Sequence, residues 1–262
     1  AYDVITVQDQ YYLALIGYLL AKKFKAGLEI QIHGWEKFYG IRKLIAKYVL
    51  PRANAIRCVS QRLRKQLVNE FGVSEEKITV VPIFVDVTNL SPFKRGIKGV
   101  KFIFLTVGRL VEVKNIIMQI EAMKEVVKKY SEAELWIVGE GPERENYELR
   151  ITNYELGKNI KLFGWQGDVD KFYEQAGAFL LTSNSEGWGL AMIEAAGYGL
   201  PIIMTDAGCA GEVIINGESG LVIPIGGQPK LVEAMIKIIE DGALRKSLGE
   251  NAKLAVSRLP DK

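Results

Sequence analysis

The feature that most constrains the fold is the alternation of short, apolar, β-rich runs with longer segments of helical periodicity. The candidate strands are residues 3–7, 29–32, 55–59, 78–81, 101–107, 134–138, 160–163, 178–182, 201–204 and 221–223. Helical-period segments lie between most of them, such as 10–25, 114–130, 168–176, 189–198 and 228–240. This alternation, with continuously apolar strands, is typical of parallel sheets covered by helices on both faces. The sequence therefore predicts an α/β, doubly wound fold.

The segment FVDVTNLSPFKRGIKG, at 84–99, interrupts the pattern. It contains one proline, two glycines and no apolar periodicity, which is typical of an interdomain linker. Four candidate strands precede it and six follow. We predict two domains, 1–92 and 93–262, of which the second is nearly complete. The first begins at a turn and a buried strand without an initiator methionine, so we expect it to be the trailing, truncated part of a domain.

The composition limits the classes of protein further. With 48% hydrophobic and 25% charged residues among 262, the chain is an ordinary globular one with room for two modest domains. Cys58 and Cys209 lie far apart without metal-type spacing. This predicts no disulfide framework and favours the reducing cytoplasm. No apolar run approaches the ~18 residues of a membrane span.

The net charge of +3 hides a strongly basic block. Residues 22–65 hold twelve Lys and Arg against two acidic residues, a net charge of +10, so the remainder carries −7. Aromatic residues interleave the block, among them Phe24, Trp35 and Tyr48. The block is either a solvated helix face or a surface that meets anionic lipid or another polyanion. Nucleic acid is not expected, because no helix-turn-helix, zinc or RNA-recognition pattern accompanies the charge.

Glycine-bearing loops follow five of the strands in the second half. They are residues 108–115, 139–142, 164–165, 183–189 and 205–208. In doubly wound folds ligands bind beyond the carboxyl ends of strands, so these loops should converge on one edge. Backbone N–H groups of glycine loops, helix N-termini and the cations Arg109 and Lys114 together suit a pyrophosphate. Taken singly, each cation would be a surface charge and each glycine a turn; their joint placement favours the phosphate site.

Two other patterns do not define sites. Gly139 and Gly141 follow a strand, but Arg144 stands where a dinucleotide-binding motif needs its third glycine. Asp168 and Asp170 resemble a metal-binding Asp-x-Asp, yet they fit the acidic start of a helix better. No cluster of His, Cys and carboxylates has metal-ligand spacing, so we expect no metal.

Five ordered blocks resemble one family. Glu186 and Glu194 are separated by seven residues in SEGWGLAMIEAAGYGLPII, and the other blocks are VGRLVEVKN (107–115), VGEGPE (138–143), LFGW (162–165) and GEVIINGESGLVIP (211–224). Together they resemble the family-4 retaining glycosyltransferases with the GT-B fold. Before the linker, YDVITVQDQ, IQIHGWE and AIRCVSQRLRKQL resemble the later part of that family's acceptor-side domain.

The resemblance implies two Rossmann-like domains, the first truncated, with a nucleotide diphosphate sugar as donor in the cleft between them and no cofactor. Arg109 and Lys114 would hold the diphosphate, and Glu194 would bind the ribose. Backbone and base contacts are implied for Gly108, Gly139, Gly164, Trp165, Gly187, Gly189 and Leu190. Without a ligand, we expect Glu194 to need water or a backbone donor.

Catalytic positions follow from the same resemblance. Glu186 would touch sugar hydroxyls near the reacting carbon, and His33 would contact the donor sugar. We assign both to positioning and electrostatics and name no covalent nucleophile. Two departures stand out: the glycine-rich loop after the family's first strand has no counterpart, and Gln8 stands where histidine is frequent.

The implied function is a retaining, metal-independent transfer of a hexose-type sugar to a glycan or lipid-linked acceptor in polysaccharide biosynthesis. The basic block would then face the inner surface of the membrane. Two alternatives stay open: a GT-B-type nucleotide-sugar epimerase, and a truncated nucleotide-binding module without turnover.

Overall fold

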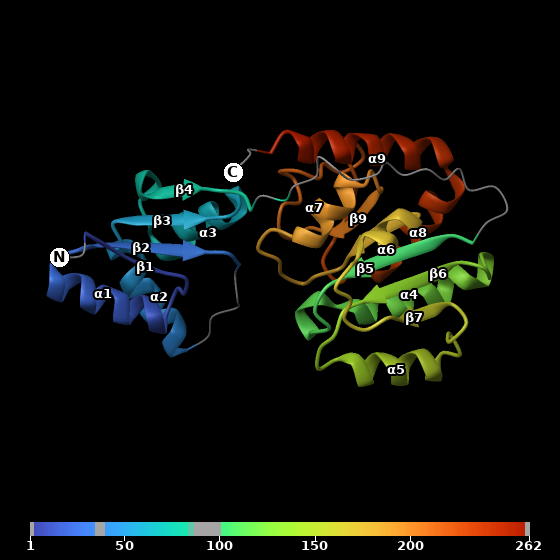
Figure 1. Ribbon diagram of the computed structural model, residues 1–262, viewed down its shortest axis with the longest axis horizontal. Coiled ribbons are helices and arrows are strands. Elements are labelled where there is room, and N and C mark those ends of the chain that lie inside the picture. The colour runs from blue at the N-terminus through green and yellow to red at the C-terminus, as the bar shows by residue number, and fades with distance from the viewer. Residues whose placement is uncertain (1–2, 35–39, 84, 86–100, 260–262) are drawn as a thin grey trace. The chain divides into compact units, whose positions relative to one another are not determined.

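The computed structural model describes residues 3–34, 40–83, 85 and 101–259. The chain divides into two compact units: Ala1–Ile83 with Glu186–Trp188, and Phe84–Ser185 with Gly189–Lys262. Each unit is a parallel sheet with helices, so the predicted α/β class is confirmed (Figure 1). The predicted linker at 84–99, except Val85, and the predicted boundary after residue 92 lie outside the described residues.

The first unit contains a four-stranded parallel sheet in the order β1-β2-β3-β4. Its strands are β1 (Val4–Val7), β2 (Gly27–Ile32), β3 (Ala55–Cys58) and β4 (Ile78–Val80). The connections contain α1 (Tyr12–Phe24), α2 (Ile41–Val49), η1 (Leu50–Arg52), α3 (Gln61–Phe71) and η2 (Glu75–Lys77). All four predicted strands are present, and α2 and α3 lie between strands, outside the helical segments named as examples.

Burial alternates along the strands of this first sheet. Leu28, Ile30 and Ile32 of β2 are buried, while Glu29 and Gln31 between them are only half-buried. The strands follow one another across the sheet in chain order, and right-handed crossovers in one direction place their helices on the same face. The described residues of this unit therefore bury one face of the sheet, unlike the expected covering of both faces.

The second unit contains a six-stranded parallel sheet in the order β10-β9-β8-β5-β6-β7. Its strands are β5 (Ile103–Val107), β6 (Glu134–Val138), β7 (Ile160–Leu162), β8 (Ala178–Leu181), β9 (Ile202–Thr205) and β10 (Leu221–Ile223). The helices are α4 (Ile116–Lys129), α5 (Arg144–Asn153), α6 (Asp170–Gln175), α7 (Leu190–Gly197), α8 (Gln228–Glu240) and α9 (Gly242–Ser257), with η3 (Glu112–Lys114) before α4. All six predicted strands are present, and α5 and α9 lie outside the helical segments named from the sequence.

The strand order of the second sheet reverses beside β5. The chain adds β6 and β7 on one side of β5 and then crosses to β8 on the other, so Leu105 faces both Trp136 and Phe179. Strands β8 and β9 consist entirely of buried residues, as expected for a sheet with helices on both faces. The reversal is a topological switch point, where the loops after β5 and β8 diverge and leave a crevice.

Candidate functional site

The loops that follow β5 and β8 are joined at the switch point of the second unit. The Asn184 backbone N–H donates to the Val113 carbonyl over 2.8 Å, and Asn115 Nδ2 donates to Asn184 Oδ1 over 3.1 Å. The buried Thr182 hydroxyl lies 3.2 Å from the Lys114 carbonyl oxygen and itself accepts from Gln119 Nε2 of α4 over 2.8 Å. These bonds fix the two loops against each other where a doubly wound fold binds its ligand.

The glycine loops after β5, β6 and β7 also meet, as the sequence predicted. The Gly108 N–H donates to the Val138 carbonyl over 3.0 Å, and the Gly139 N–H donates to the Gly164 carbonyl over 2.8 Å. A Cβ on Gly139 would lie 1.9 Å from the Gly108 carbonyl oxygen, and the φ of Gly139 is +140°. Only glycine allows these two backbones to approach so closely.

The two predicted cations occupy the loop after β5. Arg109 is exposed, while Lys114 is half-buried at the end of η3. The Lys114 side chain passes over Gly108, since its Cε would lie 3.9 Å from a Cβ on that glycine. Both cations thus belong to the same strand-end loop whose backbone is held by β6 and β8.

Helix α7 begins at the end of the loop that follows β8. Gly189 is its N-cap residue in the left-handed region, with φ of +98°, and no side chain caps the helix. The Gly189 carbonyl accepts from the N–H groups of Met192 and Ile193 over 3.0 and 3.1 Å. Leu190 is 42% exposed. An α-helix leaves its first N–H groups without intrahelical acceptors, so this end of α7 suits an anion or a polar ligand atom.

Glu194 lies one turn into α7 and is half-buried. The Tyr173 hydroxyl, from α6, donates to Glu194 Oε2 over 2.8 Å and lies 3.2 Å from the Ala191 carbonyl oxygen. Burial, followed by the charge of Glu194, raises the pKa of Tyr173, so this phenol stays a donor. The Tyr173 ring stacks on Tyr198 with 5.1 Å between centroids. The expectation that Glu194 needs water or a backbone donor is therefore wrong.

The other predicted side-chain and backbone contacts, Trp165, Glu186, Gly187 and His33, lie in loops that follow strands. Trp165, after β7, is 75% exposed beside Gly164. Glu186 is half-buried and Gly187 is buried in the segment between β8 and α7. His33 is exposed after β2, within the first unit. It contributes to a pocket of about 220 Å³ at the carboxyl ends of β2, β3 and β4, with Gln31, Ile32, Arg57, Cys58, Val59, Val81, Pro82 and Ile83.

The described residues show neither a metal-binding cluster nor a helix that could cross a bilayer. Within 3–34, 40–83, 85 and 101–259, no group of three or more His, Cys, Asp or Glu side chains could hold a metal ion. In the same ranges, no helix is long and apolar enough to cross a bilayer. The expected absence of a metal and of a cofactor stays a prediction.

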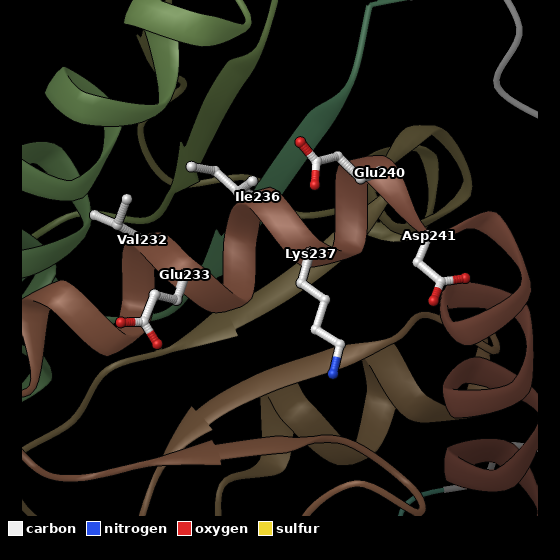
Figure 2. A pocket seen from close by; sticks show the side chains of 6 residues that line it. All are labelled: Val232, Glu233, Ile236, Lys237, Glu240 and Asp241. Atoms are coloured by element: carbon white, nitrogen blue, oxygen red, sulfur yellow. The ribbon is translucent and has the colours of Figure 1, made fainter.

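A larger hollow of about 460 Å³ lies along α8, away from the strand ends. Figure 2 shows that its six side chains all come from α8 and from Asp241 that follows it. Its acidic groups have partners, because Glu233 pairs with Lys230 and Glu240 pairs with Lys129 at the end of α4. The end of α4 leads into β6, so this hollow lies near the amino ends of the strands and is not a candidate site.

The match to known families decides the assignment. The model of the glycosyl transferases group 1 matches residues 87–255, and that of glycosyltransferase family 4 matches residues 1–89. The chain belongs to the glycosyl transferases group 1. The first match covers most of the chain, including every strand of the second unit, and the resemblance inferred from the five sequence blocks is confirmed.

Relatives of known name are similar over part of their length. The capsular polysaccharide biosynthesis glycosyltransferase CapM of Staphylococcus aureus is 26% identical over 233 residues, which cover 83% of this chain and 60% of CapM. The Escherichia coli UDP-Gal:alpha-D-GlcNAc-diphosphoundecaprenol alpha-1,3-galactosyltransferase is 28% identical over 199 residues, covering 71% of this chain and 51% of that enzyme. The chain spans about half the length of these relatives.

Solved structures share the fold. Anabaena HepE, in complex with UDP and glucose, has a TM-score of 0.86 at 21% identity, covering 99% of this chain and 74% of HepE. A mutant of S. aureus TarM, in complex with fondaparinux, alpha-GlcNAc-glycerol and UDP, has a TM-score of 0.78 at 24% identity. The match covers 90% of this chain and 48% of TarM. The chain therefore has the GT-B type of architecture, built from Rossmann-like units.

Proposed function

We propose that this chain carries the donor site of a glycosyltransferase, which moves a hexose-type sugar from a nucleotide diphosphate sugar to a glycan or lipid-linked acceptor. The observation that carries the proposal is the switch point of the second unit. There, glycine loops, two cations and the uncapped start of α7 lie at one edge of a sheet whose family transfers sugars.

The diphosphate is assigned to Arg109, Lys114 and the start of α7. As the glycosidic bond breaks, negative charge develops on the leaving diphosphate. Preorganised cations and the N–H groups of Gly189 and Leu190 would stabilise that charge without a metal ion. The transfer is proposed to retain the anomeric configuration, on the strength of the family resemblance.

The nucleoside and the sugar are assigned to the remaining residues. Glu194, oriented by Tyr173, would accept hydrogen bonds from the ribose hydroxyls. Trp165, exposed beside Gly164, offers an aromatic face to the nucleobase. Glu186 and His33 are proposed to contact the transferred sugar, Glu186 near the reacting carbon. Gly108, Gly139 and Gly187 complete the donor-binding set through their backbone.

Relatives suggest the first donor and acceptor to try. HepE and TarM were solved with UDP, and the E. coli relative is named for transfer from UDP-Gal to a diphosphoundecaprenol acceptor. We propose UDP as the nucleotide and a role in polysaccharide biosynthesis. We also propose a cytoplasmic location, because Cys58 and Cys209 are buried and form no disulfide within the described residues.

Thermal unfolding with UDP, GDP and ADP tests the proposal. A nucleotide present at a hundred times its Kd should raise the melting temperature by roughly 5–10 °C. No stabilisation by any of the three would contradict the donor site.

Turnover separates the proposed transferase from the two alternatives. A transferase releases nucleotide diphosphate from the donor sugar only when an acceptor is added. An epimerase converts the donor sugar without an acceptor, and a binding module is stabilised by nucleotide but shows neither reaction.

A further inference from the structure

Helices α1 and α2 of the first unit carry an unusual concentration of exposed apolar side chains. Of the eighteen large hydrophobic residues that are exposed in the described part of the chain, nine belong to these two helices. They are Tyr12, Leu13, Ile16, Leu19, Leu20, Phe24, Ile41, Leu44 and Tyr48, each between 40% and 67% exposed. Single exposed apolar residues are common, but a contiguous group marks an interaction surface. We call this group the α1–α2 face.

Helix α1 has apolar residues both on the side that packs on the sheet and on the exposed side, and most of its large ones are exposed. Its buried side consists of the small residues Ala14, Gly17 and Ala21. Gly17 packs so closely on the sheet that a Cβ there would lie 2.8 Å from Val7 Cγ1. The large side chains are therefore the ones left outside. Up to Ala21, α1 has no charged residue, and a helix that is apolar all round is normally buried in protein or in lipid.

Helix α2 continues the same surface. Ile41, Leu44 and Tyr48 are three and four positions apart, so they share one side of the helix. The Tyr48 ring contacts Tyr18 of α1 edge-on, with 5.8 Å between centroids. The Arg42 guanidinium lies 5.9 Å from the centre of the Tyr12 ring. In Figure 1 the two helices lie side by side, both in blue. Their exposed residues thus form one face.

The charges around this face identify its occupant. Helices α1 and α2 contain five basic residues, Lys22, Lys23, Arg42, Lys43 and Lys47, and no acidic residue. Within the described residues, no ion pair joins Lys22, Lys23, Lys43 or Lys47 to a carboxylate. A partner made only of apolar groups would leave these cations unmatched.

An anionic bilayer surface matches both properties of the face. Leu and Ile side chains enter the boundary of the acyl chains, tyrosines suit the headgroup level, and lysines reach the lipid phosphates. We propose that the α1–α2 face docks the chain, in the plane of the interface, on a membrane that contains anionic phospholipid. The proposal does not depend on the donor site, whose cations lie in the second unit.

Vesicle co-sedimentation of the full chain tests the docking. The protein should sediment with vesicles of phosphatidylcholine and phosphatidylglycerol, and much less with phosphatidylcholine alone. Added salt should weaken the binding, because it screens exposed charges. Binding that does not depend on phosphatidylglycerol, or no binding to either vesicle, would overturn the proposal.

Paired variants assign the binding to the α1–α2 face. Lys43→Ala with Lys47→Ala should weaken vesicle binding roughly 30-fold, about fivefold for each cation removed. Ile16→Ala with Leu44→Ala should weaken it by roughly tenfold or more. The matched control is Leu149→Ala with Lys158→Ala, two exposed positions of the second unit, which should leave the binding unchanged.

Two checks keep these variants interpretable. All three pairs should keep the melting temperature and nucleotide affinity of the parent chain, since every substituted side chain is exposed and outside the donor site. If the control pair weakens binding as much as the others, the α1–α2 face is not the docking surface. If Ile16→Ala with Leu44→Ala instead converts a dimer into a monomer in gel filtration, the face is an interface between copies and the membrane proposal fails.

Discussion

The two sheets of this chain are built from similar strands but bury them differently. In the second unit, β8 and β9 are buried at every residue. In the first unit, β2 alternates between buried and half-buried residues, and its outward side chains form polar contacts: Gln31 Nε2 donates to Glu29 over 3.1 Å, and Arg57 pairs with Glu29 over 3.0 Å. The strands differ because their sheets are assembled in different orders.

Strand order also decides which unit holds the candidate site. The first sheet runs β1-β2-β3-β4 without a reversal, whereas the second reverses beside β5. A reversal makes neighbouring loops diverge and leaves a crevice at the carboxyl ends. The first unit instead presents its outer helices, with their apolar face and cations. We therefore propose the nucleotide site in the second unit and surface attachment in the first.

The largest effect should come from the close backbone approach in the second unit. Gly139→Ala places a Cβ 1.9 Å from the Gly108 carbonyl oxygen at a φ of +140°, so the glycine loops must separate. We expect a loss of about 3 kcal/mol or more in the free energy of unfolding. In the first unit, a Cβ on Gly27 would meet its nearest atom at 3.6 Å. Urea unfolding should show a much smaller change for Gly27→Ala; equal losses would contradict the comparison.

The buried carboxylate Glu134 of the second unit should contribute more stability than the half-buried Glu29 of the first. Burial raises the pKa of Glu134, but bonds from Lys101, Trp136 and Lys161 outweigh burial, so the net pKa lies below 4.5. Glu134 therefore contributes stability above that pH and loses it as the pH falls through the lowered pKa.

We expect Glu134→Gln to lower the free energy of unfolding by about 1–3 kcal/mol at neutral pH. The difference from the parent chain should become smaller in acid. Glu29→Gln, whose partner Arg57 is 56% exposed, should cost less than about 1 kcal/mol. Melting temperatures measured from pH 7 down to pH 3 check both expectations. If the difference in melting temperature between Glu134→Gln and the parent chain grows in acid, folding does not lower the pKa of Glu134.

The smallest effect concerns the support of Glu194. Tyr173→Phe removes the hydroxyl that donates to Glu194 Oε2 but keeps the ring stacked on Tyr198. We expect nucleotide affinity to fall by up to about tenfold, because a single hydrogen bond that only orients a ligand-binding group contributes about 1 kcal/mol. Glu194→Ala should lose more. Calorimetric titration that finds the reverse order would show that Tyr173 does not act through Glu194.

Strand positions and the glycine loops could be predicted from the sequence because both depend on local chemistry. Apolar runs such as 134–138 coincide with β6, and Gly108, Gly139 and Gly164 are joined by backbone bonds as their strand-end positions implied. Local pattern cannot reveal a partner brought in by tertiary packing. Tyr173 lies 21 positions before Glu194, and no sequence signal links the two.

Within the described residues, the strands of the first sheet bury one face only, a detail that the sequence pattern did not reveal for a related reason. Short apolar strands alternating with helices predict a sheet with helices on both faces. The periodicity does not, however, determine the order of the strands in the sheet. The polar residues Glu29, Gln31 and Arg57 were the available signal, since they alternate with apolar residues within β2 and β3. The roles of Glu186 and His33 stay predictions.

Titration calorimetry of UDP with three forms of the chain tests the central claim, that the switch point of the second unit holds a nucleotide diphosphate. Arg109→Ala with Lys114→Ala removes two cations at the switch point, and we expect the Kd for UDP to rise roughly 100-fold or more, since bonds to charged groups contribute about 1.5–3 kcal/mol each. Arg57→Ala removes a cation at a strand end of the first sheet and should leave the Kd within about twofold. An unchanged Kd in the double variant, or an equal loss with Arg57→Ala, would contradict the account.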